Sequence, residues 1–156
     1  MRLLALLAAL LLAAGCATDD APGAAPEAED PVVSENYFGV TDPYTRAAPA
    51  GGVGALFLQI DNTTASADTL VAARTDASDD VQIHQTVQDT DGMNRMDRME
   101  AVPVPAGETV ALEPGGIHVM LLDLKRDLTV GDSLLVEFDF AGRGTLIARV
   151  PVQPAS

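Results

Sequence analysis

The sequence has a single cysteine, no tryptophan and few aromatic residues of any kind, and each shortage excludes a class of structure. With one cysteine, no disulfide can form within the chain. Without tryptophan and with few other aromatic residues, a hydrophobic core must be filled mainly by Val, Leu, Ile and Ala. Branched aliphatic side chains of this kind suit a small β-sandwich.

Basic residues are also scarce: 9 Lys and Arg stand against 23 Asp and Glu, for a net charge of −14. Such a chain cannot neutralise phosphates, so nucleic acid is excluded as a partner. An anionic lipid surface should repel it. The acid excess is compatible with a solvated surface kept soluble by self-repulsion, or with a field that steers a cation or a basic partner.

The only long apolar run lies at the start of the chain. Arg2 precedes about a dozen apolar residues, too few to span a bilayer and typical of a secretory signal. The run ends in Leu-Ala-Ala-Gly followed by Cys16, which resembles a bacterial lipobox. We therefore predict a lipoprotein signal peptide over residues 1–15 and lipidation of Cys16. This places the protein in the periplasm or cell envelope, attached to a membrane by its lipid, and leaves no thiolate for a blue-copper site of the His-Cys-Met kind.

The length of the chain allows one domain with appendages. Residues 16–31 consist largely of Ala, Pro, Asp, Glu and Gly, which predicts a flexible acidic tether after the lipidated cysteine. Residues 32–156 are predicted to form a single domain.

Within that domain no stretch has a sustained helical period, apart from one helical turn expected within residues 121–129. Short apolar or alternating runs recur between turn signals, which predicts an all-β, antiparallel Greek-key β-sandwich. The predicted strands are residues 32–40, 53–62, 69–75, 81–87, 95–102, 109–112, 118–122, 133–140 and 145–152.

Every histidine, and every methionine except Met1, lies between His84 and Met120. Histidine and methionine have no general reason to gather in one quarter of a sandwich. A chemistry that uses both is the binding of Cu(I), a soft ion that accepts thioether sulfur and imidazole. These uncharged donors disfavour hard dications, which require oxygen ligands.

The spacing of these residues supports a common site. His118 and Met120 are two residues apart, so on a strand their side chains share a face. His84 and Met96 flank a predicted hairpin around residues 89–92, which would bring its two arms side by side. Two further methionines compete with Met96 for a place in the site, and core packing is the simpler interpretation for both of them. They are Met93 and Met99.

The stretch from His84 to Leu124 resembles the periplasmic copper chaperones of the PCuAC family. The hallmark of that family is a His, then a Met, then 21 residues, then His-x-Met, and here 21 residues separate Met96 from His118. Weaker similarity extends over residues 42–152. Two features depart from the pattern: the interval from His84 to Met96 is one residue longer than the commonest form, which keeps Met93 as an alternative, and Gln85 and Thr86 replace an auxiliary Met.

The resemblance implies a cupredoxin-like β-sandwich that holds one Cu(I) through His84, Met96, His118 and Met120. It implies delivery of the ion to the binuclear copper centre of cytochrome c oxidase (subunit II) or to a thiol-bearing copper chaperone. We expect a monomer and no enzymatic activity, because no Ser-His-Asp set, nucleophilic Cys or paired carboxylates are evident. The alternatives are a copper-buffering lipoprotein without a specific recipient and a structural lipoprotein that binds no metal.

Overall fold

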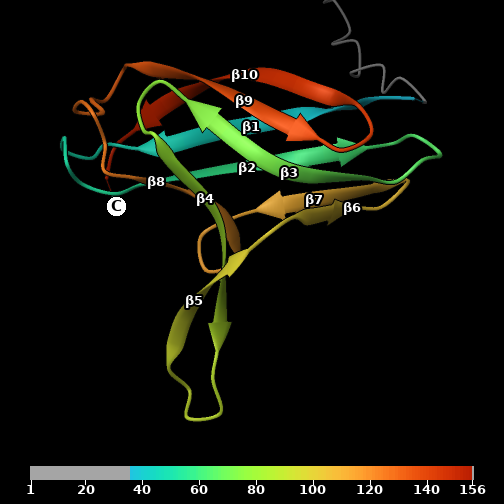
Figure 1. Cartoon of the computed structure of the whole chain (residues 1–156), viewed down its shortest axis with the longest axis horizontal. Coiled ribbons are helices and arrows are strands. Elements are labelled where there is room, and N and C mark those ends of the chain that lie inside the picture. The colour runs from blue at the N-terminus through green and yellow to red at the C-terminus, as the bar shows by residue number, and fades with distance from the viewer. Residues whose placement is uncertain (1–35, 156) are drawn as a thin grey trace, which may run out of the picture. The chain divides into compact units, whose positions relative to one another are not determined.

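The computed structural model describes residues 36–155, which form an all-β domain (Figure 1). The predictions for residues 1–15 and 16–31, including lipidation of Cys16, lie outside the described residues. Between residues 36 and 155 there is no helix that could cross a bilayer. The strands are β1 (Phe38–Arg46), β2 (Gly54–Asn62), β3 (Asp68–Thr75), β4 (Asp80–Gln88), β5 (Asn94–Met99), β6 (Val102–Val104), β7 (Glu108–Leu112), β8 (Ile117–Leu122), β9 (Ser133–Phe140) and β10 (Gly144–Gln153).

The strands are hydrogen-bonded in the order β5-β4-β8-β2-β1-β10-β9-β3-β6, and β7 pairs with the second half of β2. All of these strand pairs are antiparallel except β1 with β10, which run parallel and pair at two positions. This short contact joins the two halves of the strand order, β5-β4-β8-β2-β1 and β10-β9-β3-β6. Both halves contribute side chains to one hydrophobic core, as expected of a sandwich. The prediction of an all-β sandwich is confirmed, with one parallel pair added.

The core is aliphatic with a few phenylalanines, as the lack of tryptophan implied. Alternation along the strands selects the inward residues. In β2, Leu56, Leu58 and Ile60 are buried, and in β9, Val136 and Phe138 are fully buried. The opposite faces of these strands are left for solvent or for function.

Two predicted strand boundaries and one predicted helical turn were wrong. The first strand runs to Arg46 because Asp42 and Pro43, a typical turn signal, are absorbed as a bulge in β1, with Asp42 at a φ of 47°. The strand predicted over residues 95–102 is broken after Met99 into β5 and β6. The helical turn expected within residues 121–129 is absent, because Asp123 adopts a φ of 49° and Leu124 exchanges backbone hydrogen bonds with the 51–52 turn.

A polar network closes one end of the sandwich around Asn62, which is fully buried at the end of β2. The side-chain amide of Asn62 donates hydrogen bonds to the carbonyl oxygens of Ser66, Val104 and Pro105. Its Oδ1 accepts from the backbone N–H and the hydroxyl of Thr64. One side chain thus joins β2, the following turn and β6.

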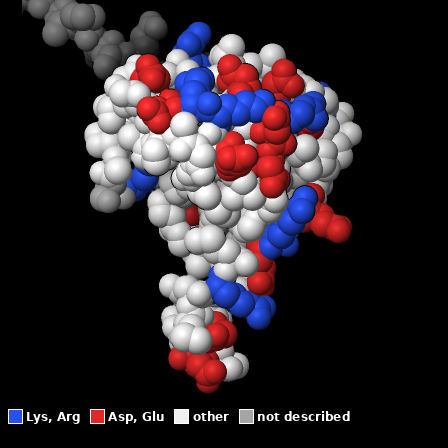
Figure 2. Space-filling view, turned by 60° about the vertical axis from the view of Figure 1, so that its left-hand side comes forward, with Lys and Arg blue, Asp and Glu red and all other residues white. Residues whose placement is uncertain are grey.

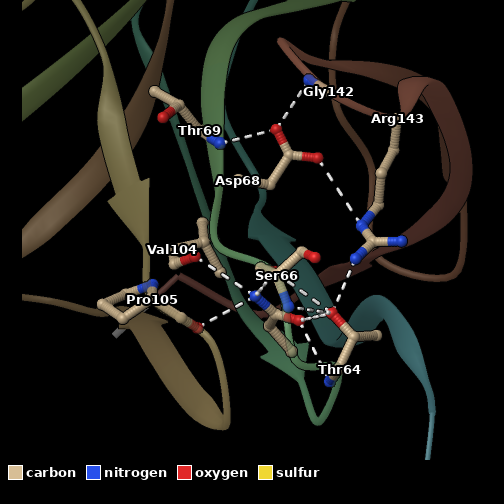
Figure 3. A network of polar contacts seen from close by, with 9 residues as sticks. Thr64, Ser66, Asp68, Thr69, Val104, Pro105, Gly142 and Arg143 are labelled. Atoms are coloured by element: carbon tan, nitrogen blue, oxygen red, sulfur yellow. Dashed lines mark hydrogen bonds and ion pairs between the residues drawn. The ribbon is translucent and has the colours of Figure 1, made fainter.

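Asp68 extends this network with a carboxylate that is almost wholly buried (Figure 3). Its Oδ1 accepts hydrogen bonds from the backbone N–H groups of Thr69 and Gly142, and the guanidinium of Arg143 lies 3.6 Å from Oδ2. Arg143 also stacks over the ring of Phe38. Partnered in this way, the buried charge is compatible with a folded state.

The β4–β5 hairpin, called the arm below, projects from the body of the domain (Figure 1). Near its base β4 pairs with β5 on one side and with β8 on the other. Beyond Thr86 the two strands of the arm pair only with each other, up to a turn over residues 89–93. The predicted site residues lie on the arm and on β8.

Candidate metal centre

The two histidines lie directly opposite each other on neighbouring strands. The register of β4 and β8 pairs His84 with His118, and their ring centroids are 6.2 Å apart with an interplanar angle of 40°. Two imidazoles that share one metal through bonds of about 2 Å have centroids roughly 5 to 6.5 Å apart. Residues 34 positions apart in the chain are therefore within reach of a common ion.

Strand parity places both predicted methionine ligands on this same face. Met120 follows His118 by two residues on β8 and lies opposite Gln82. Met96 lies on β5 opposite Thr86, which is two residues from His84 on β4. All four side chains consequently emerge from one face of the β5-β4-β8 ribbon, with the histidines in the middle.

The residue opposite His84 on the arm is Arg98 and not Met96. The arm turns about residue 91, because Asp89 closes the turn on Met93 and His84 pairs with Arg98. The Asp89 carboxylate accepts hydrogen bonds from the backbone N–H groups of Asp91 and Met93. Met96 is thereby shifted to the diagonal position next to His84.

Exposure differs greatly within the site. His118 is buried, with 4% of its surface exposed, His84 and Met120 are half-buried, and Met96 is 59% exposed. Met93 is 66% exposed and lies in the turn of the arm, before β5 begins at Asn94. Met99 lies opposite Ile83 and packs against the core. Register therefore favours Met96 over both rivals, although its ligation stays a prediction.

His118 is held in one orientation by its surroundings. Its Nδ1 lies 3.1 Å from the carbonyl oxygen of Gly116, which can only accept, so Nδ1 carries the proton. The Gly116 carbonyl is placed there by a turn in which Gly115 has a φ of 82°. The ring of Phe57 packs 6.3 Å from the imidazole. A neutral His118 therefore presents the lone pair of Nε2 to a metal.

His84 has a different set of contacts. Its Nε2 lies 2.9 Å from Oε1 of Gln82, while its Nδ1 is buried and has no hydrogen-bond partner among the residues that the structure describes. Burial lowers the pKa of His84 most; repulsion from His118, when that ring is protonated, and from Arg98 lowers it further, against the opposing effect of Asp80. The imidazole is therefore neutral at pH 7, as a metal ligand must be.

Hard-ion ligands do not gather at this site. Within residues 36–155 no three His, Cys, Asp or Glu side chains are placed to share a metal. The arm carries both acidic and basic side chains, with acidic ones at its end (Figure 2), where the turn contains Asp89 and Asp91. The donors on the site's face are imidazole and thioether, a set that suits a soft, low-charge cation.

Sequence reasoning missed Gln82 and Phe57, which orient the histidines, and Arg98, which faces His84. Gln82 is two residues before His84, so strand parity alone could have placed it on the same face. Phe57 is brought to His118 by β2, and only the fold reveals that contact.

The fold is that of a PCuAC domain, as comparison with solved structures shows. The apo PCuAC domain from PmoF1 superimposes with a TM-score of 0.62 at 26% identity, covering 74% of this chain and 92% of that one. CuI-DR1885 from Deinococcus radiodurans gives 0.57 at 26%, covering 73% and 78%. The copper-bound PCuAC domain from PmoF2, at 23% identity, shares the fold with a TM-score of 0.63 over 74% of this chain and 92% of that one. The cupredoxin-like prediction is confirmed.

Residues 39–152 match the family model described as LpqE-like, a family of lipoproteins, and the chain belongs to that family. Its relatives include the lipoprotein Lxx21020 of Leifsonia xyli subsp. xyli, 32% identical over 109 residues. They also include RP573 of Rickettsia prowazekii, 32% identical over 99 residues. The matches cover 70% and 63% of this chain and 66% and 54% of the relatives, so the chain spans less than two thirds of either relative.

Proposed function

We propose that the domain is a copper chaperone that binds one Cu(I) ion through His84, Met96, His118 and Met120. The observation that carries the proposal is the cross-strand pair of His84 and His118, with Met120 beside it on the same face. Two structural neighbours, the PmoF2 domain and DR1885, are described as copper-bound forms. The neutral His and Met donors match the softness of Cu(I) and leave its single charge in place.

The gradient of exposure suits a protein that must release its cargo. His118 and Met120 form the inner part of the site, and Met96, 59% exposed on the arm, forms the outer part. An incoming ligand from a recipient can replace the Met96 thioether first, so the ion is never without ligands. Thiolates of the recipient supply the driving force, since soft anionic sulfur binds Cu(I) more strongly than thioether does.

For the whole protein we propose a lipid anchor at Cys16 and an extracytoplasmic location, in keeping with the lipoprotein family. The recipient proposed is the binuclear copper centre of cytochrome c oxidase or a thiol-bearing chaperone. A deletion strain that loses oxidase activity at limiting copper supports delivery. One that loses only tolerance of excess copper supports buffering instead.

X-ray absorption of the Cu(I)-loaded protein tests the ligand set. The wild type is expected to show two nitrogen and two sulfur donors, and Met96→Leu one sulfur fewer, with an affinity about tenfold lower. Met93→Leu is the matched control, because Met93 is similarly exposed but lies in the turn at the end of the arm, and it should leave the sulfur count unchanged. If Met93→Leu loses a sulfur donor, Met93 and not Met96 is the ligand. If the wild type forms no one-to-one complex with Cu(I), the alternative of a structural lipoprotein without a metal is favoured.

Proton competition gives a further prediction. Because the pKa of His84 is lowered below the ordinary value of about 6.5, its protonation sets in at a lower pH than for an exposed histidine. The affinity for Cu(I) should therefore be constant from about pH 8 to 7. It should fall in acid by up to about tenfold per pH unit for each ligand histidine that must lose a proton. Competition titration against a chelator of known pH dependence measures this.

Arg98→Gln provides the control for the pH profile. Removal of this positive charge opposite His84 should raise the pKa of His84 and shift the fall in affinity to higher pH. An affinity that does not fall at any acidic pH at which the protein stays folded would show that the imidazoles are not ligands.

A further inference from the structure

Three side chains on the site's face of β4 form a hydrogen-bonded chain that leads away from His84. Asp80, Gln82 and His84 are each two residues apart, so they share one face of the strand. Gln82 Nε2 lies 2.8 Å from Asp80 Oδ1, and Gln82 Oε1 lies 2.9 Å from His84 Nε2. The chain ends at the histidine that faces His118.

The chemistry of these groups fixes the direction of every hydrogen bond in the chain. An ionised carboxylate can only accept, so the amide nitrogen of Gln82 must face Asp80. The amide oxygen then faces His84 and can only accept, so His84 Nε2 must carry a proton. A neutral imidazole has one N–H, which leaves the lone pair on Nδ1. This is the buried nitrogen that has no partner among the described residues.

His118 has the opposite arrangement. Its Nδ1–H donates to the Gly116 carbonyl, so its lone pair is on Nε2. In each histidine, one ring nitrogen thus makes the hydrogen bond that holds the orientation, and the other keeps an unshared lone pair. The centroids of the two rings are 6.2 Å apart.

We infer that Gln82 is a positioning residue that sets His84 to coordinate Cu(I) through Nδ1, while His118 coordinates through Nε2. The inference rests on the proposed function. No hydrogen bond of His84 has to break when the ion arrives, because the Gln82 bond is made by the other nitrogen. The buried Nδ1 lone pair, which lacks a partner within residues 36–155, gains one in the ion. Because Nδ1 is the ring nitrogen nearer the backbone, coordination through it would hold the ion close to the strands.

Long-range ¹H–¹⁵N spectra of the imidazole rings test this directly in the metal-free and Cu(I)-loaded protein. In the metal-free wild type, His84 should be protonated at Nε2 and His118 at Nδ1. On loading, the Nδ1 resonance of His84 and the Nε2 resonance of His118 should shift. Gln82→Leu should abolish the tautomer preference of His84 and weaken Cu(I) binding about tenfold. Gln82→Glu combined with Asp80→Asn, which keeps an acceptor toward His84 without placing two carboxylates in contact, should restore the Nε2–H tautomer.

The matched control is Gln85→Leu, the same substitution on the same strand at an exposed position of the opposite face. It should change neither the ring spectra nor the affinity. Coordination of His84 through Nε2 in a one-to-one complex would overturn the role of Gln82 and leave the proposed function standing. That role is equally overturned if Gln82→Leu leaves both the tautomer and the affinity unchanged. Failure of the wild type to bind Cu(I) would instead refute the proposed function itself.

Discussion

Replacing His118 with alanine is expected to lower the affinity for Cu(I) by more than about a hundredfold, since even residues that only orient metal ligands contribute 10- to 100-fold. His118 is the most buried member of the predicted site and is oriented on both sides, by the Gly116 carbonyl and by Phe57. Its loss removes the donor that is held most rigidly. Competition with a Cu(I) chelator under anaerobic conditions measures the affinity.

The effect of this change must be separated from a loss of folding. His118→Ala leaves a void beside Phe57, so its thermal unfolding is measured alongside, and the affinity is compared at a temperature where the variant is folded. Gln85→Ala, exposed on the other face of β4, should bind as the wild type does. An affinity within tenfold of the wild type in folded His118→Ala would mean that the ion lies elsewhere.

Much of the fold could be predicted from the sequence, because alternation and turn residues act locally. The run over residues 133–140 alternates and became β9 without change, and its inward side chains include Phe138. The errors arose where a local signal was overridden. Asp42 and Pro43 typically end a strand, but here the flanking residues keep their pairing with β2 and the turn signal becomes a bulge.

The site was predictable to the extent that it depends on strand parity. His118 and Met120 share a face because they are two residues apart, and that needs no fold. The position of Met96 depends on the exact register of the arm, in which Arg98 and not Met96 faces His84. The pairing of His84 with His118 joins strands far apart in the chain, and only the resemblance to a known family could predict it.

Replacing Asn62 with alanine is expected to lower the free energy of unfolding by about 3 kcal/mol, because buried hydrogen-bonding groups that lose their partner cost roughly 1 to 3 kcal/mol each. The fully buried Asn62 side chain makes five hydrogen bonds, to Ser66, Val104, Pro105 and twice to Thr64. Among the carbonyl oxygens that it leaves, the contact to Val104 is buried, so water cannot readily replace the amide there. Urea unfolding followed by circular dichroism measures the change.

Asn94→Ala is the matched control, since Asn94 is exposed at the start of β5 and should alter stability by less than about 0.5 kcal/mol. Asn62 lies at the far end of β2 from Ala55, which pairs with Met120. Folded Asn62→Ala should therefore keep its affinity for Cu(I), as substitutions at separated sites act independently. If Asn62→Ala has the same free energy of unfolding as the wild type, water replaces the lost hydrogen bonds to these carbonyl groups. If it is stable but binds copper poorly, the two ends of the sandwich are coupled through β2.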